Sequence, residues 1–249
     1  MTYCCGMLVE EGLVMMADTR TNAGVDDISS YRKLHMLCET DDRLIVACTS
    51  GNLSVTQLVI SRLEEGLAPL QEGDPPRTLA NIGSMFQAAE LVGEAVAAAR
   101  KDVGKALLAA NIDAGISLLL GGRVGEGRLR LYLVYSAGNF IECHSEAPFL
   151  QIGETKYGKP ILDRALQWNT PLDEAVKVGL ISFDSTMRSN LAVGRPLDLI
   201  VIPVDRKQPN IQRRIGVDDP YFDDLSARWS MLLGESRAII PTPPFMQQD

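Results

Sequence analysis

The stretch TYCCGMLVEEGLVMMAD, residues 2–18, contains two apolar runs separated by a Glu-Glu-Gly turn at residues 10–12. Short apolar runs divided by a turn signal of this kind predict a β-hairpin. The first run starts at Thr2 and the second ends at Asp18, so the returning strand brings Asp18 back beside the amino terminus. This hairpin is the starting point for predicting both the fold and the candidate active site.

A second hairpin is expected at residues 33–49, where KLHMLCET and RLIVACT are joined by two aspartates. The segment between the hairpins, TRTNAGVDDISSY at residues 19–31, is rich in turn-forming polar residues and is expected to be a surface loop. After Gly51 the apolar residues recur at helical spacing up to Gly66, and a longer helix is expected over residues 79–103.

The rest of the chain continues with strands and then helices. Four strands are expected near residues 115–120, 129–135, 139–143 and 149–152. Two helices follow at 157–166 and at about 171–187, and a buried strand, DLIVIPV, ends before Asp205. Runs of strands that alternate with helix pairs favour an α+β fold, in which antiparallel sheets are covered by helices.

The domain organisation is expected to be simple. A compact chain of 249 residues can form one large domain, and no internal repeat or linker divides residues 1–249. From about Arg206 the sequence contains a charged helix, residues 221–233, and a Pro-rich tail, IIPTPPFMQQD. Residues 206–249 are therefore expected to be a C-terminal helical and Pro-rich extension, which packs on a neighbour or stays mobile.

Composition excludes several classes of function. The formal net charge is −8, which would repel a nucleic-acid backbone. The chain has no apolar run long enough to span a membrane and no leader-like start, so a cytoplasmic location is expected. Its five cysteines are best interpreted as small core residues. Its two histidines stand in no metal-ligand motif, so neither a metal site nor a serine–histidine triad is expected.

Thr2 is the candidate nucleophile. Removal of Met1 would place a free α-amine on the residue that carries the hydroxyl, and an amine with a pKa near ~7.7 can accept the hydroxyl proton. Lys33 opens the third expected strand, and beside Asp18 it would be a fixed positive charge that lowers the pKa of the amine. Taken singly, Asp18 is a loop cap and Lys33 a solvated strand end. Together with Thr2 they favour catalysis.

Two turns offer supporting groups. TSGN, residues 49–52, joins a strand to a helix, and its glycine would let backbone N–H groups form an oxyanion hole. The same residues also suit a simple helix cap, and the two roles are compatible. Ser136, in YSAGN, lies at a turn where its hydroxyl could hydrogen-bond the amine, although alone it is only a turn serine.

The set Thr2, Asp18 in ADTRTNAG, Lys33 in SYRKLH, the TSGN turn and Ser136 in SAG resembles the active site of proteasome-type N-terminal-nucleophile (Ntn) hydrolases. Within that superfamily, DTRTNAGVDDIS and YRKLH are most similar to the bacterial proteasome homologues of the Anbu type. The resemblance covers roughly residues 2–204. It implies a four-layer αββα sandwich and a threonine nucleophile in a subunit that assembles with copies of itself, in a ring-like or helical form.

The resemblance also implies residue roles. Thr2 would be nucleophile and base, Lys33 the charge that tunes the amine, Asp18 the residue that orients it, Gly51 an oxyanion donor and Ser136 a support for the amine. Asp184 is a weaker match. In proteasome β-subunits an Asp precedes a Ser by three residues, whereas here a Ser follows Asp184 directly and another follows at longer spacing.

The expected function is therefore a threonine peptidase that hydrolyses peptide bonds, with peptide or unfolded protein as substrate and without a cofactor. An ATP-dependent unfoldase is left open as a further partner. A small-molecule amidohydrolase and a non-catalytic, ring-forming scaffold remain as alternatives. The segment GETKYGKP, residues 153–160, nearly spells a phosphate-binding loop, but Pro160 stands where Ser or Thr would bind magnesium. It is interpreted as a turn that enters a helix.

Overall fold

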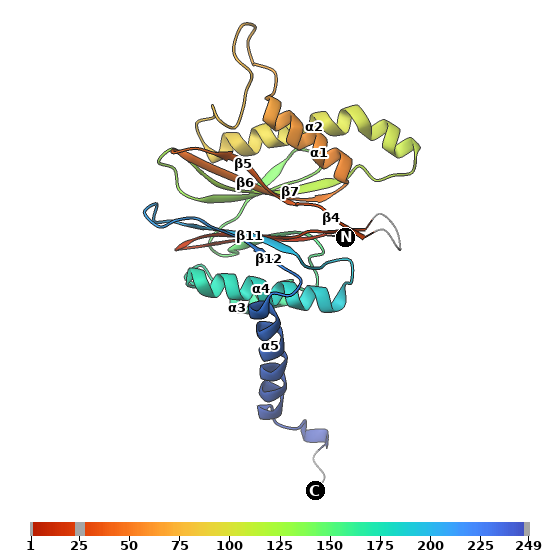
Figure 1. The fold of residues 1–249 in the computed structure, drawn as a ribbon, viewed down its shortest axis with the longest axis vertical. Coiled ribbons are helices and arrows are strands. Elements are labelled where there is room, and N and C mark those ends of the chain that lie inside the picture. The colour runs from red at the N-terminus through yellow and green to blue at the C-terminus, as the bar shows by residue number, and fades with distance from the viewer. Residues whose placement is uncertain (1, 23–27, 247–249) are drawn as a thin grey trace.

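Two β-sheets face each other, and helices cover the outer face of each sheet (Figure 1). This computed structural model describes residues 2–22 and 28–246. Met1, the centre of the expected loop at residues 23–27 and the last three residues of the tail lie outside the described part. The layers are those of an α+β, αββα sandwich, so the expected fold class is confirmed.

The first sheet contains the amino-terminal hairpin, and its order is β10-β1-β2-β11-β12 with antiparallel neighbours. Its strands are β1 (Tyr3–Val9), β2 (Gly12–Asp18), β10 (Phe149–Gly153), β11 (Leu197–Pro203) and β12 (Ile211–Ile215). Every residue of β1, β2 and β11 is buried. Because both faces of these strands are covered, their sequences are continuous apolar runs rather than alternating ones.

The second sheet has the order β5-β6-β7-β8-β9, again antiparallel. Its strands are β5 (Leu34–Glu39), β6 (Arg43–Gly51), β7 (Ile116–Val124), β8 (Arg130–Val134) and β9 (Phe140–Glu142). Alternate residues of β1 enter different cores: Tyr3 packs with the helices below the first sheet, whereas Cys4 packs between the sheets. The side chain of Thr2 is therefore expected to share the inter-sheet face of β1.

Helices α1 (Leu53–Glu65) and α2 (Met85–Ala109) cover the second sheet, and α3 (Lys159–Ala165) and α4 (Leu172–Ser189) cover the first (Figure 1). Asn52 caps α1 by accepting a hydrogen bond from the Val55 amide. In the described residues, no helix is both long and apolar enough to cross a bilayer.

The start of α2 corrects the sequence prediction. A helix was expected from residue 79, but α2 begins six residues later, after Ser84, whose hydroxyl accepts a hydrogen bond from the Gln87 amide. Leu79 is buried all the same. Its apolar side chain joins the core from an irregular segment, so hydrophobic spacing placed it on the correct face but in the wrong element.

Two strand pairings were also missed. The expected surface loop after Asp18 contains β3 (Arg20–Asn22) and β4 (Ile28–Ser30), which pair with each other. Strand β12 lies inside the region expected to be the C-terminal extension, yet it completes the first sheet beside β11. Only the part after β12 leaves the sandwich: α5 (Pro220–Ile239) projects from the α4 side of the body and leads to a short 3-10 turn, Pro244–Met246 (Figure 1).

Candidate active site

The return of the first hairpin brings Asp18 to the beginning of the chain. The β1–β2 register pairs Cys4 with Ala17, so Asp18 lies beside Tyr3. The Tyr3 amide donates a hydrogen bond to Asp18 Oδ1 at 3.0 Å. Because this amide belongs to the residue that follows Thr2, the carboxylate is held within one residue of the candidate nucleophile.

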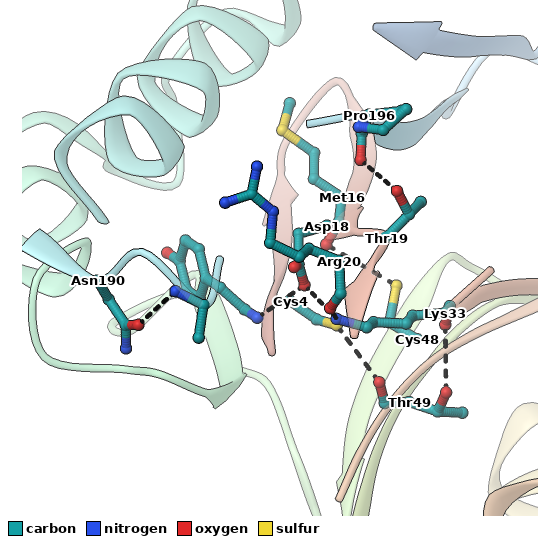
Figure 2. A network of polar contacts seen from close by, with 12 residues as sticks. Cys4, Met16, Asp18, Thr19, Arg20, Lys33, Cys48, Thr49, Asn190 and Pro196 are labelled. Carbon is teal, nitrogen blue, oxygen red and sulfur yellow. Dashed lines mark hydrogen bonds and ion pairs between the residues drawn. The ribbon is translucent and has the colours of Figure 1, made fainter. Parts of the chain in front are cut away.

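Lys33 reaches the same carboxylate from the second sheet (Figure 2). It lies directly before β5, and its Nζ donates to Asp18 Oδ1 at 2.7 Å and to the Arg20 carbonyl at 2.6 Å. Asp18 is fully buried and Lys33 is 6% exposed. The pair therefore puts a buried lysine ammonium beside the start of β1.

The electrostatics of Asp18 reflect two opposing effects. Burial raises the pKa of Asp18 above its ordinary value, while the positive charge and hydrogen bond of Lys33, together with the Tyr3 amide, lower it. A buried carboxylate without a cation would be strongly disfavoured. Lys33 is thus the group that makes an ionised Asp18 acceptable at this position.

The backbone of Lys33 is also hydrogen-bonded to the end of β6. The Thr49 amide donates to the Lys33 carbonyl at 2.9 Å, and the Cys4 thiol donates to the Thr49 carbonyl at 3.6 Å (Figure 2). Gly51 lies two residues further on, with φ +106, and a Cβ there would come within 2.2 Å of the Gly115 carbonyl oxygen. Only glycine fits this turn, which connects the site to the first residue of α1.

Tyr3 fixes the start of β1 from the opposite face. Its hydroxyl is hydrogen-bonded to Ser182 Oγ of α4 at 2.7 Å and accepts from Gln151 Nε2 at 2.6 Å. Burial raises the pKa of Tyr3 well above its ordinary value, so the ring stays neutral. Thr2 itself is half-buried, and the backbone that follows it is anchored through the Thr2 carbonyl and the Tyr3 amide.

Two of the candidate residues make contacts elsewhere. Ser136 Oγ accepts a hydrogen bond from the Ile116 amide at 2.8 Å and also bonds the Ile116 carbonyl, in the strand beside Gly51. Asp184 accepts hydrogen bonds from Arg188 Nε at 3.1 Å and from Ser226 Oγ of α5 at 2.7 Å. Ser136 thus braces the second sheet and Asp184 holds α5 to α4.

Glu154 and Asn190 were not among the candidates, yet Glu154 contacts Thr2 and Asn190 contacts Glu154. The Glu154 amide donates to the Thr2 carbonyl at 2.6 Å, and Asn190 Nδ2 donates to Glu154 Oε2 at 3.1 Å. Glu154 lies in GETKYGKP, which resembled a phosphate loop; in the fold, its first residue ends β10 beside β1 and its last residues begin α3, so it is the helix-entry turn that was expected. The only sequence signal was Gly153, whose φ of +84 lets the chain pass within contact of Thr2.

No metal-binding cluster of three or more His, Cys, Asp or Glu side chains occurs within residues 2–22 and 28–246. The groups at the site are the Thr2 hydroxyl, the buried Asp18–Lys33 pair, the backbone of the Gly51 turn and the Glu154 carboxylate. A hydroxyl nucleophile, a fixed cation and backbone donors are the components of acyl transfer.

The proteasome subunit family matches residues 2–202 of the chain. Among solved structures, Anbu (ancestral beta-subunit) from Yersinia bercovieri is 42% identical with a TM-score of 0.86, covering 97% of this chain and 98% of that one. The Anbu (Gly-1) mutant from Hyphomicrobium sp. strain MC1 is 42% identical with a TM-score of 0.88, covering 98% and 99%. The helical assembly of the Anbu complex from Pseudomonas aeruginosa is 41% identical with a TM-score of 0.86, covering 97% and 98%. No curated protein sequence matches the chain. In both sequence and structure, the chain belongs to the proteasome subunit family and is of the Anbu type.

Proposed function

We propose that this chain is a threonine peptidase whose nucleophile is Thr2, exposed by removal of Met1. The observation that carries the proposal is the buried Asp18–Lys33 ion pair, 2.7 Å long, beside the amide that follows Thr2. Burying two charges costs several kcal/mol per ion before their attraction is counted. A buried cation at this position suits the tuning of an amine and a hydroxyl, and it is hard to explain as a stabilising feature alone.

In this mechanism the Thr2 Oγ attacks the carbonyl carbon of the scissile amide, and the α-amine of Thr2 takes the hydroxyl proton. The amine then returns this proton to the leaving amine as the C–N bond breaks, leaving an ester on Thr2 Oγ. Lys33 lowers the pKa of the amine and favours loss of the hydroxyl proton. Water, deprotonated by the same amine, hydrolyses the ester.

Gly51 is proposed as the oxyanion donor. Its turn follows Thr49, which is hydrogen-bonded to Lys33, so its backbone belongs to the same cluster. Removing one such donor typically lowers turnover by about 100-fold to 1000-fold. Ser136, expected to support the amine, and Asp184, the weaker family match, are instead proposed to act at a distance, through the second sheet and α5.

Two alternatives make different demands on the structure. A small-molecule amidohydrolase needs a deep pocket at Thr2. A cavity of about 1210 Å³ is present, but it lies between α4 and the β11–β12 edge, and its walls do not include Thr2, Asp18 or Lys33. A non-catalytic scaffold has no use for the buried ion pair. The peptidase is therefore the better supported proposal.

We further propose that the chain acts in the cytoplasm as an assembly of its own copies. One similar solved structure is described as a helical assembly. In this chain, α5 exposes several large apolar residues outside the sandwich, namely Met231, Leu232, Leu233 and Ile239. Apolar surface of this kind on a projecting helix suits contact with a neighbour. An ATP-dependent unfoldase would be a further partner for a peptidase of this type.

The proposal is tested by an electrophile directed at N-terminal threonine, followed by mass mapping of the adduct. We expect intact mass to show that Met1 is absent, the adduct to lie on Thr2, and Thr2→Ala to abolish both labelling and peptide hydrolysis. Thr40→Ala is the matched control, because Thr40 is an exposed threonine in the turn between β5 and β6. Retention of Met1 in every preparation, or hydrolysis by Thr2→Ala at the parent's rate, would remove Thr2 as the nucleophile.

A further inference from the structure

Glu154 is a buried acid whose carboxylate is held by neutral donors. The residue is 7% exposed. Its Oε1 accepts a hydrogen bond from the Lys156 amide at 3.1 Å and its Oε2 accepts from Asn190 Nδ2 at 3.1 Å. Each oxygen has capacity for a further donor, because an ionised carboxylate can accept about four hydrogen bonds.

The charge of Glu154 has no partner in the described residues, where no salt bridge includes it. Asp18, the other buried acid near Thr2, is paired with Lys33 at 2.7 Å. Buried charges in proteins are usually paired, because an unpaired one loses its hydration without compensation. The difference between the two acids indicates that a cation is still to be supplied beside Glu154.

The strand register identifies that cation. Strand β1 pairs with β10 so that Tyr3 faces Gly153, and the Glu154 amide donates to the Thr2 carbonyl at 2.6 Å. Thr2 and Glu154 are therefore neighbours across the end of the β1–β10 pair, which puts the Glu154 side chain within reach of the Thr2 backbone. We propose that the Glu154 carboxylate is the counter-ion of the Thr2 α-ammonium that Met1 removal creates. The inference rests on the proposed function in taking Met1 to be removed.

The consequence for catalysis follows from the sign of each charge near the amine. Glu154, Asp18 and the carbonyl end of α4 at Asn190 favour the ammonium, whereas Lys33 and the Arg20 guanidinium favour the neutral amine. Asp18 is paired with Lys33, and the Arg20 guanidinium donates to the Leu191 carbonyl, so among the described residues Glu154 is the acid beside Thr2 that has no salt-bridge partner. It holds the amine protonated at neutral pH, so the base becomes available only as the pH rises. Glu154 is thus a positioning residue that restrains turnover near pH 7.

The test uses full-length chain prepared to begin at Thr2. The pH dependence of α-amine acetylation at Thr2, read by mass spectrometry of the N-terminal peptide, gives the pKa of the amine without any need for turnover. We expect Glu154→Gln to lower this pKa by about one unit and, where hydrolysis is measured, to raise kcat/KM below the pKa by up to about tenfold. Glu154→Asp should keep a value close to that of the parent.

Glu146→Gln is the matched control, because it removes an exposed glutamate from the turn before β10 and should leave the amine unchanged. Glu154→Ser provides a second neutral variant if the Gln side chain disturbs the donors on Lys156 and Asn190. An amine pKa that is equal in the parent and in whichever neutral variant folds would overturn the inference. Absence of adduct and turnover in the parent at every pH would instead reject the proposed function, while the acetylation profile still decides the role of Glu154.

Discussion

The β1–β2 hairpin and helix α5 use apolar residues in opposite ways. Every residue of β1 and β2 is buried inside the sandwich. In α5 the buried residues are Phe222 and Leu225, near its start, whereas Leu232 and Leu233 are about half exposed. The apolar content of the hairpin is thus explained by this chain alone. The exposed apolar residues of α5 are not covered by the described part of this chain, which fits the proposed contact with a neighbouring copy.

The two regions also differ in what their charges contribute. The Asp18–Lys33 pair is 2.7 Å long and buried, and the Arg228–Asp224 pair on α5 is 2.6 Å long with both side chains more than half exposed. The distances are similar, but water screens the second pair, which is therefore expected to contribute little to stability. The burial of an ion pair, and not its length, therefore decides how much it contributes.

The largest expected effect comes from breaking the buried pair with Lys33→Met. Asp18 would be left as an unpaired buried acid, so the free energy of unfolding should fall by about 3–5 kcal/mol. Turnover should fall at least about 100-fold as the amine loses its tuning charge. Denaturant unfolding and peptide hydrolysis measure the two effects. Lys101→Met, on the exposed face of α2, should change neither; equal losses in both variants would contradict a special role for Lys33.

The next effect concerns the exposed face of α5. We expect the double variant Leu232→Glu and Leu233→Glu to break the assembly into smaller species, while the melting temperature of the body changes by only a few degrees. Light scattering coupled to size-exclusion chromatography measures the mass. Leu70→Glu is the control, because Leu70 is 80% exposed in the segment between α1 and α2, and these helices lie on the opposite side of the sandwich from α5 (Figure 1). An assembly that survives the double variant would show that α5 is not its contact surface.

A smaller effect is expected at the junction of the two regions. Asp184→Asn weakens the hydrogen bonds to Arg188 and Ser226, and the root of α5 should be loosened by about 1–2 kcal/mol. Hydrogen exchange of the α5 amides should rise, with turnover unchanged. Asp224→Asn, on the exposed side of α5, is the matched control. If Asp184→Asn loses turnover while hydrogen exchange of the α5 amides stays unchanged, Asp184 would belong to the active site, as the family resemblance implied.

The smallest expected effect is a pH dependence of the stability of the sandwich. Burial, with a lesser contribution from Arg32, lowers the pKa of His35 below its ordinary value of 6.5. Protonation therefore favours the unfolded chain, and the stability that His35 contributes is complete above about pH 6.5 and is lost as the pH falls through the folded pKa. When the pH is lowered from 7.5 to 5.5, the melting temperature of His35→Gln should fall by less than that of the parent. The exposed His144→Gln should behave like the parent; a parent and His35→Gln with the same pH profile would refute the prediction.

Much of the sandwich was predictable because its elements carry local signals. The hairpin runs of β1 and β2 end at a turn, and α1 starts at the Asn52 cap and ends at Gly66. The start of α2 was wrong by six residues, because Leu79 has an apolar side chain at helical spacing while Ser84 supplies the cap. Strand β12 was missed because four of its five residues are exposed, which leaves little apolar pattern to detect.

The sequence by itself determined the two ends of the first hairpin, and with them the placing of Asp18 beside the start of β1, since both belong to one short turn-connected unit. Only the tertiary structure decided which distant segment lies on the other side of Thr2. The pairing of β10 with β1 brings in Glu154 from far along the chain, and the packing of α5 on α4 draws Asp184 toward Ser226. Such contacts depend on strand order and helix packing, which no local period or turn signal encodes.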